Sequence, residues 1–469
     1  MNEGLTKYYQ FLKRFFVFIV LETVILIASI NKDFFLFKIL INYLVLVGIT
    51  PFIFEKIDQR KIDPFSPIAI FSFFYILLFG AKAIDFVIFR QKLLLEDEKY
   101  YSLALLYAII GLHLFQIGYY SKVWRIFIRK KNRVPQDWSL TKFKIILISY
   151  SLISFISFLI ILELTGGFSF YFHNIHAAMV KITSGSALFF MAVLIAEIPL
   201  LIWFSYVLEL KRKVFIFGLY LILVVLLFIF LGERGHVISL IISLLAFYHY
   251  GKQKINLKPL FIVGLVFMLF LSLFGQYREF TKYDLSVKKA GFNAKVKFEA
   301  IYHSVMSDFD QFIRLTDIIK YTPEKIDFQI GKTFLNLFLK PIPSRIWEDK
   351  PQGAGVIVTK NLYPKHYSAH VSIAPSLVGE LYLNFHLIGI ITGMFLFGVV
   401  SRGLFEMLQH NKKNKNVIVV YAILLPFVYS ELRGDFAVVT SFLIFKLFFL
   451  FLALYFITNK RNAIAAIDK

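Results

Sequence analysis

The stretch Pro341–Pro351, with the sequence PIPSRIWEDKP, lies in a long hydrophilic segment that runs from Gln276 to Pro375. Outside that segment the sequence is a series of apolar runs separated by short polar connections. A rigid, basic and aromatic segment of this kind has no use on a surface that faces lipid. The pattern therefore predicts many membrane-spanning helices and one large loop outside the membrane, with the chemistry placed beneath that loop.

The composition supports a polytopic membrane protein. Hydrophobic residues make up 58% of the 469 residues and charged residues only 17%, whereas soluble domains are about a quarter charged. The formal net charge is +22, but Lys and Arg cluster in short connections, where anionic lipid headgroups explain them better than nucleic acid. The chain has no cysteine, which excludes disulfides, zinc–thiolate sites and thiol nucleophiles.

Twelve apolar runs have the character of membrane spans, which need about 20 apolar residues each. They lie near residues 15–30, 34–54, 67–81, 101–119, 143–164, 186–208, 214–231, 236–250, 259–275, 377–400, 417–431 and 436–457. Their continuous apolarity, without alternation of period two, excludes a transmembrane barrel. We therefore expect an all-α protein in three parts: about nine spans in 1–275, the partly helical loop 276–375, and about three spans in 376–469.

The placement of basic residues sets the expected orientation. With the N-terminus in the cytoplasm, the inner segments together hold 26 Lys and Arg, whereas the short outer segments hold 8. The inner segments are 1–14, 55–66, 120–142, 209–213, 251–258, 401–416 and 458–469. The loop holds 15 Lys and Arg, but long loops cross the membrane regardless of their charge. We expect both termini in the cytoplasm and the loop on the outer side.

Four polar clusters then fall on the outer side. They are Gly232–His236 (GERGH), Gln276–Glu279 (QYRE), a series within the loop that leads into Glu380, and Glu431–Asp435 (ELRGD). The loop series includes Arg314, Arg345, His366 and His370. Any one of these charges could be an interfacial anchor or half of an ion pair. Arginine recurs beside glycine in tight outer turns, however, and its planar guanidinium suits phosphate oxygens. The repetition indicates an anion site at the outer boundary of the membrane.

Polar residues inside the apolar runs have two interpretations. Glu22, His113, Glu163 and Glu197 each cost a few kcal/mol if they face lipid, so they should face protein or water. Such a residue could belong to a proton path, as in a transporter. The more common arrangement is a satisfied contact between two helices.

The loop itself has a pattern typical of a folded segment. Residues 299–321 have helical spacing, with one apolar face formed by Ile301, Val305, Phe309, Phe312 and Ile319. Thr322-Pro323 should end this helix, because proline disfavours a helical residue before it. We expect the helix to pack over the ends of the spans.

Aromatic residues in the second half of the loop suggest contact with sugars. Tyr363, His366, Tyr367 and His370 offer rings that stack and groups that form hydrogen bonds, and Trp347 is assigned with them to glycan binding. The chain lacks the P-loop, H-E-x-x-H and G-x-S-x-G patterns. Their absence excludes P-loop ATPases, zincins and hydrolases with a nucleophile elbow.

These features resemble the oligosaccharide repeat-unit polymerases, the Wzy-type O-antigen polymerase family. The resemblance covers most of the chain in architecture, with about twelve spans and one large outer loop late in the sequence. Its motifs are Gly232–Gly235 (GERG), Pro341–Pro351, Pro375–Gly389 (PSLVGELYLNFHLIG) and Arg433–Asp435 (RGD). One departure is His386, where the family pattern leads us to expect a small residue, often glycine.

The resemblance implies a membrane glycosyltransferase of GT-C-like architecture. It would transfer a growing glycan from an undecaprenyl pyrophosphate carrier to a new lipid-linked repeat unit. The site would lie on the periplasmic or extracellular side of a bacterial cytoplasmic membrane. The lipid pyrophosphate is a good leaving group, so neither a metal nor a cofactor is needed if arginines hold it. Partners would be the lipid-linked oligosaccharide, the bilayer, a chain-length regulator and a flippase, with no nucleic acid.

Within this framework we assign roles to particular residues. The pyrophosphate would be held by Arg234, Arg278, Arg345 and Arg433. The acceptor hydroxyl needs a base within hydrogen-bond reach, and Glu380 and His370 are the candidates.

Two other functions remain open from the sequence. An O-antigen ligase shares the spans, the late loop and the donor, and differs in its acceptor. A flippase for lipid-linked oligosaccharides, or another transporter, would instead place charges along a cavity at the midplane and show repeat symmetry.

Overall fold

The computed structural model describes most of the chain in separate stretches. These are residues 33–57, 63–89, 91–126, 137–173, 187–210, 213–231, 234–255, 302, 306, 309–339, 347, 350–368 and 372–458. Regular structure within these stretches is helical, and an isolated β-bridge joins Trp138 to Thr458. The predicted all-α class is confirmed for the described residues.

The described helices follow the predicted runs. In the first half they are α2 (Asp33–Ile57), α3 (Pro67–Tyr75), η1 (Ile76–Ala81), α4 (Lys82–Phe89), α5 (Gln91–Tyr120), η2 (Val123–Ile126), α6 (Leu140–Thr165), α7 (Gly167–His173), α9 (Ala187–Val193), η3 (Leu194–Ala196), α10 (Glu197–Leu210), α11 (Val214–Phe230) and α12 (Arg234–Gly251). The second half contains α15 (Gln311–Tyr321), α16 (Lys332–Leu339), α17 (Ala354–Leu362), α18 (Pro364–Ser368), α19 (Ser376–His410), α20 (Lys415–Arg433) and α21 (Phe436–Ile457).

Eight helical segments of the described part are long and apolar enough to cross a membrane. They are Leu36–Ile53, Pro67–Ile88, Asp97–Tyr120, Leu140–Thr165, Leu188–Glu209, Ser376–His410, Lys415–Arg433 and Phe436–Ile457. Two shorter apolar helices, Val214–Phe230 and Gly235–Gly251, match two further predicted runs. The predicted runs 15–30 and 259–275 lie outside the described residues. The chain is therefore a multi-pass membrane protein, while twelve spans and a GT-C architecture stay predictions.

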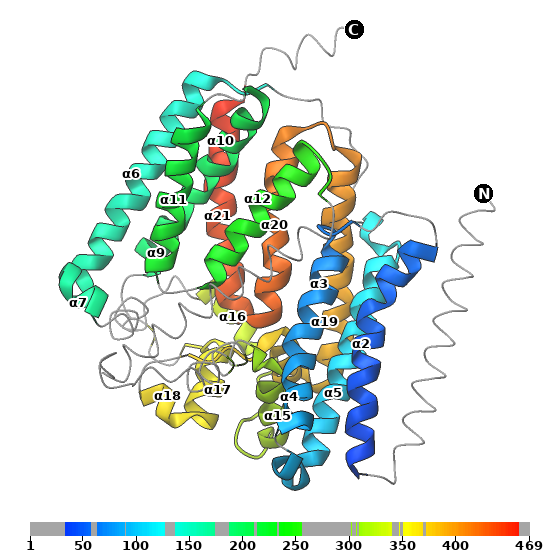
Figure 1. The fold of residues 1–469 in the computed structure, drawn as a ribbon. Coiled ribbons are helices and arrows are strands. Elements are labelled where there is room, and N and C mark those ends of the chain that lie inside the picture. The colour runs from blue at the N-terminus through cyan, green and yellow to red at the C-terminus, as the bar shows by residue number, and fades with distance from the viewer. Residues whose placement is uncertain are drawn as a thin grey trace.

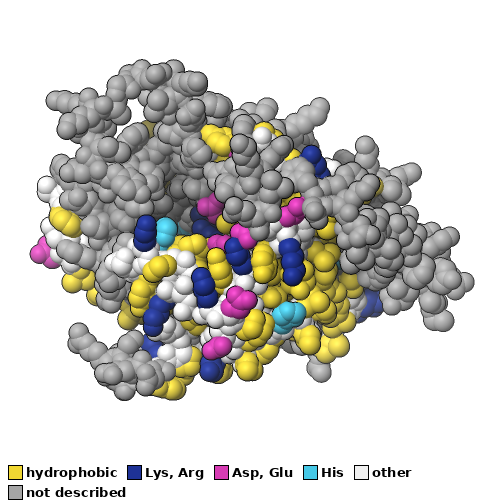
Figure 2. Space-filling model, turned by 90° about the horizontal axis from the view of Figure 1, so that it is seen from below, with side chains coloured by type: hydrophobic (Ala, Val, Ile, Leu, Met, Phe, Trp, Pro, Cys, Tyr) yellow, Lys and Arg dark blue, Asp and Glu magenta, His cyan; other side chains and the backbone are white. Residues whose placement is uncertain are grey.

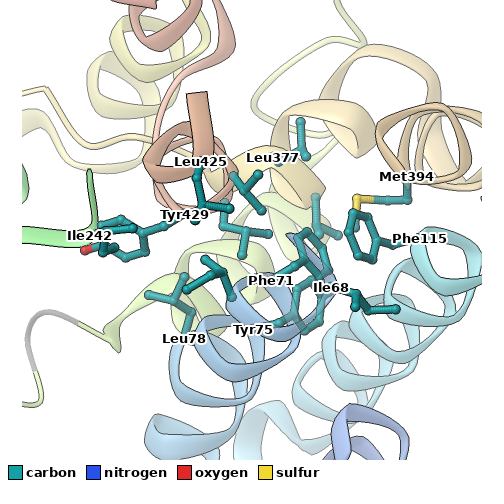
Figure 3. Packing of buried hydrophobic residues seen from close by; sticks show 14 of the residues in the cluster. Ile68, Phe71, Tyr75, Leu78, Phe115, Ile242, Leu377, Met394, Leu425 and Tyr429 are labelled. Carbon is teal, nitrogen blue, oxygen red and sulfur yellow. The ribbon is translucent and has the colours of Figure 1, made fainter. Parts of the chain in front are cut away.

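The helices form two packed groups that meet along α10, α12 and α21. Figure 1 shows α6, α9 and α11 on one side and α2, α3, α5 and α19 on the other. The larger core buries side chains of α3, α5, α19 and α20, which converge in Figure 3. A smaller core joins α6 to α11 and α12.

Glycine brings α5 and α19 into direct backbone contact. A Cβ atom at Gly118 would lie 2.0 Å from the carbonyl oxygen of Phe395, and one at Gly398 would lie 2.1 Å from that of Phe115. No side chain fits at either position, because real Cβ atoms do not approach an oxygen so closely. Small residues that permit such contact are typical of helix pairs in membranes.

Two of the polar residues within the spans contact a neighbouring helix. Glu197 on α10 accepts a charged hydrogen bond from Lys446 on α21, at 2.5 Å between Oε2 and Nζ, and both side chains are buried. His113 on α5 lies 3.2 Å from the hydroxyl of Tyr43 on α2. Helix contacts are thus confirmed for Glu197 and His113. Glu163 is exposed near the end of α6, and Glu22 lies outside the described residues.

The loop helix predicted to end before Thr322-Pro323 is present as α15. It ends at Tyr321 and buries Phe312, Leu315, Ile318 and Ile319 against the membrane helices. Lys320 forms an ion pair of 2.7 Å with Asp97 near the start of α5. The expectation that this helix packs over the span ends is confirmed. Most of the residues from 299 to 308 lie outside the described part.

Candidate functional site

One end of the bundle gathers the described helices of the loop. In Figure 1, α15, α16, α17 and α18 lie at the end where α12, α19 and α21 begin and α20 finishes. Figure 2 looks onto this end and shows Lys and Arg side chains interspersed with Asp and Glu among apolar residues. The helix starts and the hairpin that carry the predicted site residues therefore share one end of the molecule.

Helix α19 is broken near its start. Phe385 and His386 have non-helical backbone angles, and His386 has a φ of 56°, in the left-handed region that favours glycine. This is the position at which the family pattern leads us to expect a small residue. The break separates a short buried segment, residues 376–384, from the long membrane helix that follows.

The segment between α15 and α16 caps the C-terminal end of that short helix. The backbone N–H groups of Gln329 and Ile330 donate to the carbonyl oxygens of Leu383 and Asn384, at 2.9 and 3.1 Å. The side-chain oxygen of Asn384 accepts from the N–H of Gly331 at 2.9 Å. The last carbonyl groups of a helix have no hydrogen-bond donor within the helix. The N–H groups of this loop segment act as those donors.

Glu380 sits in this short helix and joins three elements. It is 0% exposed. Its Oε1 accepts from the hydroxyl of Thr333 on α16 at 2.7 Å, and its Oε2 accepts from the N–H of Phe436 at the start of α21 at 2.8 Å. Asn384 donates to the same Thr333 oxygen at 2.7 Å. Both oxygens of Glu380 are thus engaged, and the carboxylate holds α16 and α21 on α19.

The α20–α21 hairpin is tied to the loop by a second carboxylate. Asp435 caps α21 through the N–H of Val438 at 3.2 Å and accepts from the N–H of Gly355, at the start of α17, at 2.7 Å. The hairpin sequence Glu431–Asp435 therefore contacts both the membrane helices and the loop. Glu431 is buried and accepts from Thr440 at 2.9 Å.

Arg433 and Arg314 lie where α15 meets this hairpin. The carbonyl of Arg433 accepts from the side chain of Gln311 at 3.4 Å, and its guanidinium donates to the hydroxyl of Tyr429 at 3.2 Å. Arg314 follows Gln311 by three residues, which places both on one face of α15. Its guanidinium donates to the carbonyl of Ala374 at 3.1 Å, just before α19. Both arginines are half-buried.

Arg234 begins α12 at the same end of the bundle. Helices α12 and α20 run antiparallel, with the rings of Tyr250 and Tyr421 5.3 Å apart. In Figure 1, α12 and α21 begin at the same end of the bundle. The ring of His236, two residues later, is 5.9 Å from Phe442 on α21.

Comparison with known proteins identifies the family. A family model described as O-antigen polysaccharide polymerase Wzy matches residues 11–462, nearly the whole chain. The chain belongs to this family. No curated protein and no solved structure matches it. Membership supports a glycosyltransferase-like activity that polymerises repeat units, in a membrane protein that acts on a lipid-linked substrate.

In this Wzy family member, a further acid lies on α15 that the sequence did not single out. The carboxylate of Asp317 accepts a hydrogen bond from the hydroxyl of Tyr363, which follows α17. Burial raises the pKa of Asp317 above its usual range, while Tyr363 and Lys320 act to lower it. Burial also raises the pKa of Tyr363. The signal in the sequence is slight: a carboxylate on the less apolar side of a predicted amphipathic helix.

The remaining predicted site residues fall into two groups. Trp347 and Tyr367 are each 43% exposed, so their rings are accessible, and Tyr363 lies 6.0 Å from His366 ring to ring. Arg278, Arg345 and His370 lie outside the described residues. The structure thus brings Arg433, Tyr363 and Glu380 to one end of the bundle, together with Arg314 from the polar series of the loop and with Asp317 as an addition.

Proposed function

We propose that this chain transfers a growing glycan from undecaprenyl pyrophosphate to a new lipid-linked repeat unit on the outer face of the bacterial cytoplasmic membrane. The observation that carries the proposal is the junction of α15 with the α20–α21 hairpin, where Gln311 contacts the Arg433 backbone and Arg314 lies on the same face of α15 as Gln311. The family match over residues 11–462 supports the polymerisation. Both termini are then cytoplasmic, and a flippase and a chain-length regulator act beside the enzyme.

The arginines would hold the pyrophosphate. Guanidinium groups form strong, charge-assisted hydrogen bonds to phosphate oxygens. Arg433 and Arg314 come from separate elements, and Arg234 begins its helix at the same end of the bundle. Arg278 and Arg345 complete the proposed set. Such a set stabilises the negative charge that develops as the lipid pyrophosphate leaves, which removes the need for a metal.

The acceptor hydroxyl would lose its proton to a side-chain base. Glu380 has both oxygens engaged and no exposed surface, which suits a positioning role better than proton transfer. Asp317 is less enclosed, and its raised pKa brings it nearer the range in which a base works well. We therefore place Asp317 beside Glu380 and His370 among the candidate bases.

Aromatic rings of the loop would bind the glycan. Trp347 and Tyr367 have exposed rings, which can stack on the apolar faces of sugars. Tyr363 links this region to Asp317 through its hydroxyl. The sugars would then pass from the aromatic surface of the loop to the carboxylate on α15.

The test is the length of the glycan made in cells that lack the native gene and carry a variant. We expect Arg433→Gln and Arg314→Gln to insert normally and to yield glycans of a single repeat unit. Lys360→Gln removes an exposed cation from α17 and should leave the ladder intact. Glycans of normal length from both arginine variants would remove this junction from the site. Loss of all attached glycan, including the single unit, would indicate a ligase instead.

A further inference from the structure

A cavity lies at the opposite end of the molecule from the loop. It has a volume of about 270 Å³ and opens between η2, which follows α5, and the last turns of α19. Its lining includes Lys122, Trp124, Arg125, Arg402, Glu406 and His410. Arg402, Glu406 and His410 are spaced by four residues, so they share one face of α19.

The lining has an excess of positive charge. Lys122, Arg125 and Arg402 contribute three cations, and Glu406 contributes one carboxylate, which leaves +2 with His410 neutral. Glu406 pairs with Arg402 and lies 3.5 Å from His410. The carboxylate can therefore orient Arg402 but cannot neutralise the pocket.

Aromatic rings hold two of these cations in place. The guanidinium of Arg125 lies 5.6 Å from the centre of the Trp124 ring, and that of Arg402 lies 5.2 Å from the Tyr119 ring. Trp124 is buried against α19, which fixes η2 on the helix. The guanidinium groups are thus positioned before a ligand arrives.

An exposed apolar residue follows the cavity lining in the sequence. Ile126, the last residue of η2, is 77% exposed next to Arg125. Trp and Tyr are typical of the boundary between lipid and water. An exposed isoleucine beside a basic, aromatic pocket suits a ligand with a charged head and a hydrocarbon tail better than a soluble anion.

We propose that this pocket binds the phosphate headgroup of an anionic phospholipid of the cytoplasmic leaflet. Its residues fall within the segments 120–142 and 401–416, which the charge distribution places in the cytoplasm. That leaflet offers anionic headgroups, and basic pockets between spans on this side bind them. The site is separate from the polymerisation site, so the proposal shares with the proposed function only the orientation of the chain and does not rest on the polymerisation.

The test is the thermal unfolding of the purified full-length protein in detergent, titrated with phosphatidylglycerol, phosphatidylcholine or inorganic phosphate. Phosphatidylglycerol should raise the unfolding temperature, and the other two should not. Arg125→Gln should weaken the apparent affinity about tenfold, the usual effect of losing one charged hydrogen bond. Arg402→Gln should weaken the affinity by a similar factor. Because this change also removes the ion-pair partner of Glu406 and could impair folding, Arg125→Gln is the variant that decides the test.

Lys415→Gln is the matched control. Lys415 is a cation at the same end of the molecule, paired with Glu209 at 2.6 Å and outside the pocket. It should leave the affinity unchanged. An equal response to phosphatidylcholine, an equal response to inorganic phosphate, or an equal loss in Lys415→Gln and Arg125→Gln would each overturn the proposal.

Discussion

The seam between α5 and α19 and the end of the bundle that carries the loop are built in different ways. At the seam, Gly118 and Gly398 let the backbones of α5 and α19 touch, and the two helices can approach this closely only because neither position carries a side chain. At the loop end, a broken helix and buried carboxylates are held by individual hydrogen bonds. The seam tolerates no change in volume, whereas the loop end can lose one bond and keep its fold. We expect mutations to affect folding at the seam and catalysis at the loop end.

The largest effect is expected at the seam. Gly118→Leu would place a side chain where a Cβ already lies 2.0 Å from the Phe395 carbonyl oxygen, so α5 and α19 would have to separate. We predict no recoverable monodisperse protein, measured by size-exclusion chromatography after extraction. Gly218→Leu on α11 is the control, because no atom lies within 4 Å of its added Cβ. Equal yields from the two variants would show that the seam is not tightly packed.

The next effect concerns the buried ion pair in the bundle. Lys446→Met leaves Glu197 charged and without this partner, which should cost about 3–5 kcal/mol of unfolding free energy. The double variant with Glu197→Gln should recover most of that loss. Lys415→Gln, at a partly exposed pair, should cost only about 0–1 kcal/mol. A double variant as unstable as Lys446→Met alone would contradict this account.

A smaller loss of stability is expected at the loop end. Thr333→Val keeps the shape of the side chain but removes the donor to Glu380 and the acceptor for Asn384. The cost should be about 1–3 kcal/mol, the usual effect of leaving a buried polar atom unpaired. Glycan length should fall more than expression does. Full-length glycan from this variant would show that the network has no part in polymerisation.

The smallest effect on stability, with a clear effect on rate, is expected from Tyr363→Phe. The Tyr363 hydroxyl lowers the pKa of Asp317, so its removal should raise that pKa further. A base works only when deprotonated, so the rate should fall with decreasing pH, beginning at a higher pH in the variant. The pH–rate profile in proteoliposomes measures this shift, and Asp317→Asn should abolish the acid limb. An acid limb that stays in place in Tyr363→Phe would remove Asp317 as the base.

Much of the bundle could be predicted from the sequence because continuous apolarity marks spans without reference to neighbours. Ten predicted runs coincide with described helices, and the periodicity of residues 299–321 led to α15 and its end at Tyr321. The break at Phe385 could not be predicted from hydropathy, since the segments on both sides of Asn384–His386 are apolar and read as one span. Only the resemblance, through His386, pointed there.

The candidate site was less predictable, because it depends on contacts between distant segments. Arg433 stood out through its hairpin, but its junction with Gln311 and Arg314 needs the packing of α15. Nothing in the local sequence distinguishes Thr333 or Asp317. Each becomes a candidate only through a hydrogen bond to a distant residue, Thr333 to Glu380 and Asp317 to Tyr363. Polar networks assembled from three or four elements leave no periodic signal in any one of them.

The most direct measurement is cysteine labelling at the two ends of the molecule. The chain has no native cysteine, so Tyr367→Cys on α18 and Lys412→Cys after α19 each carry one thiol at an exposed position. A maleimide that cannot cross membranes should label Tyr367→Cys in intact spheroplasts and label Lys412→Cys only after permeabilisation. The reverse pattern would place the loop in the cytoplasm and contradict a polymerisation site on the outer face.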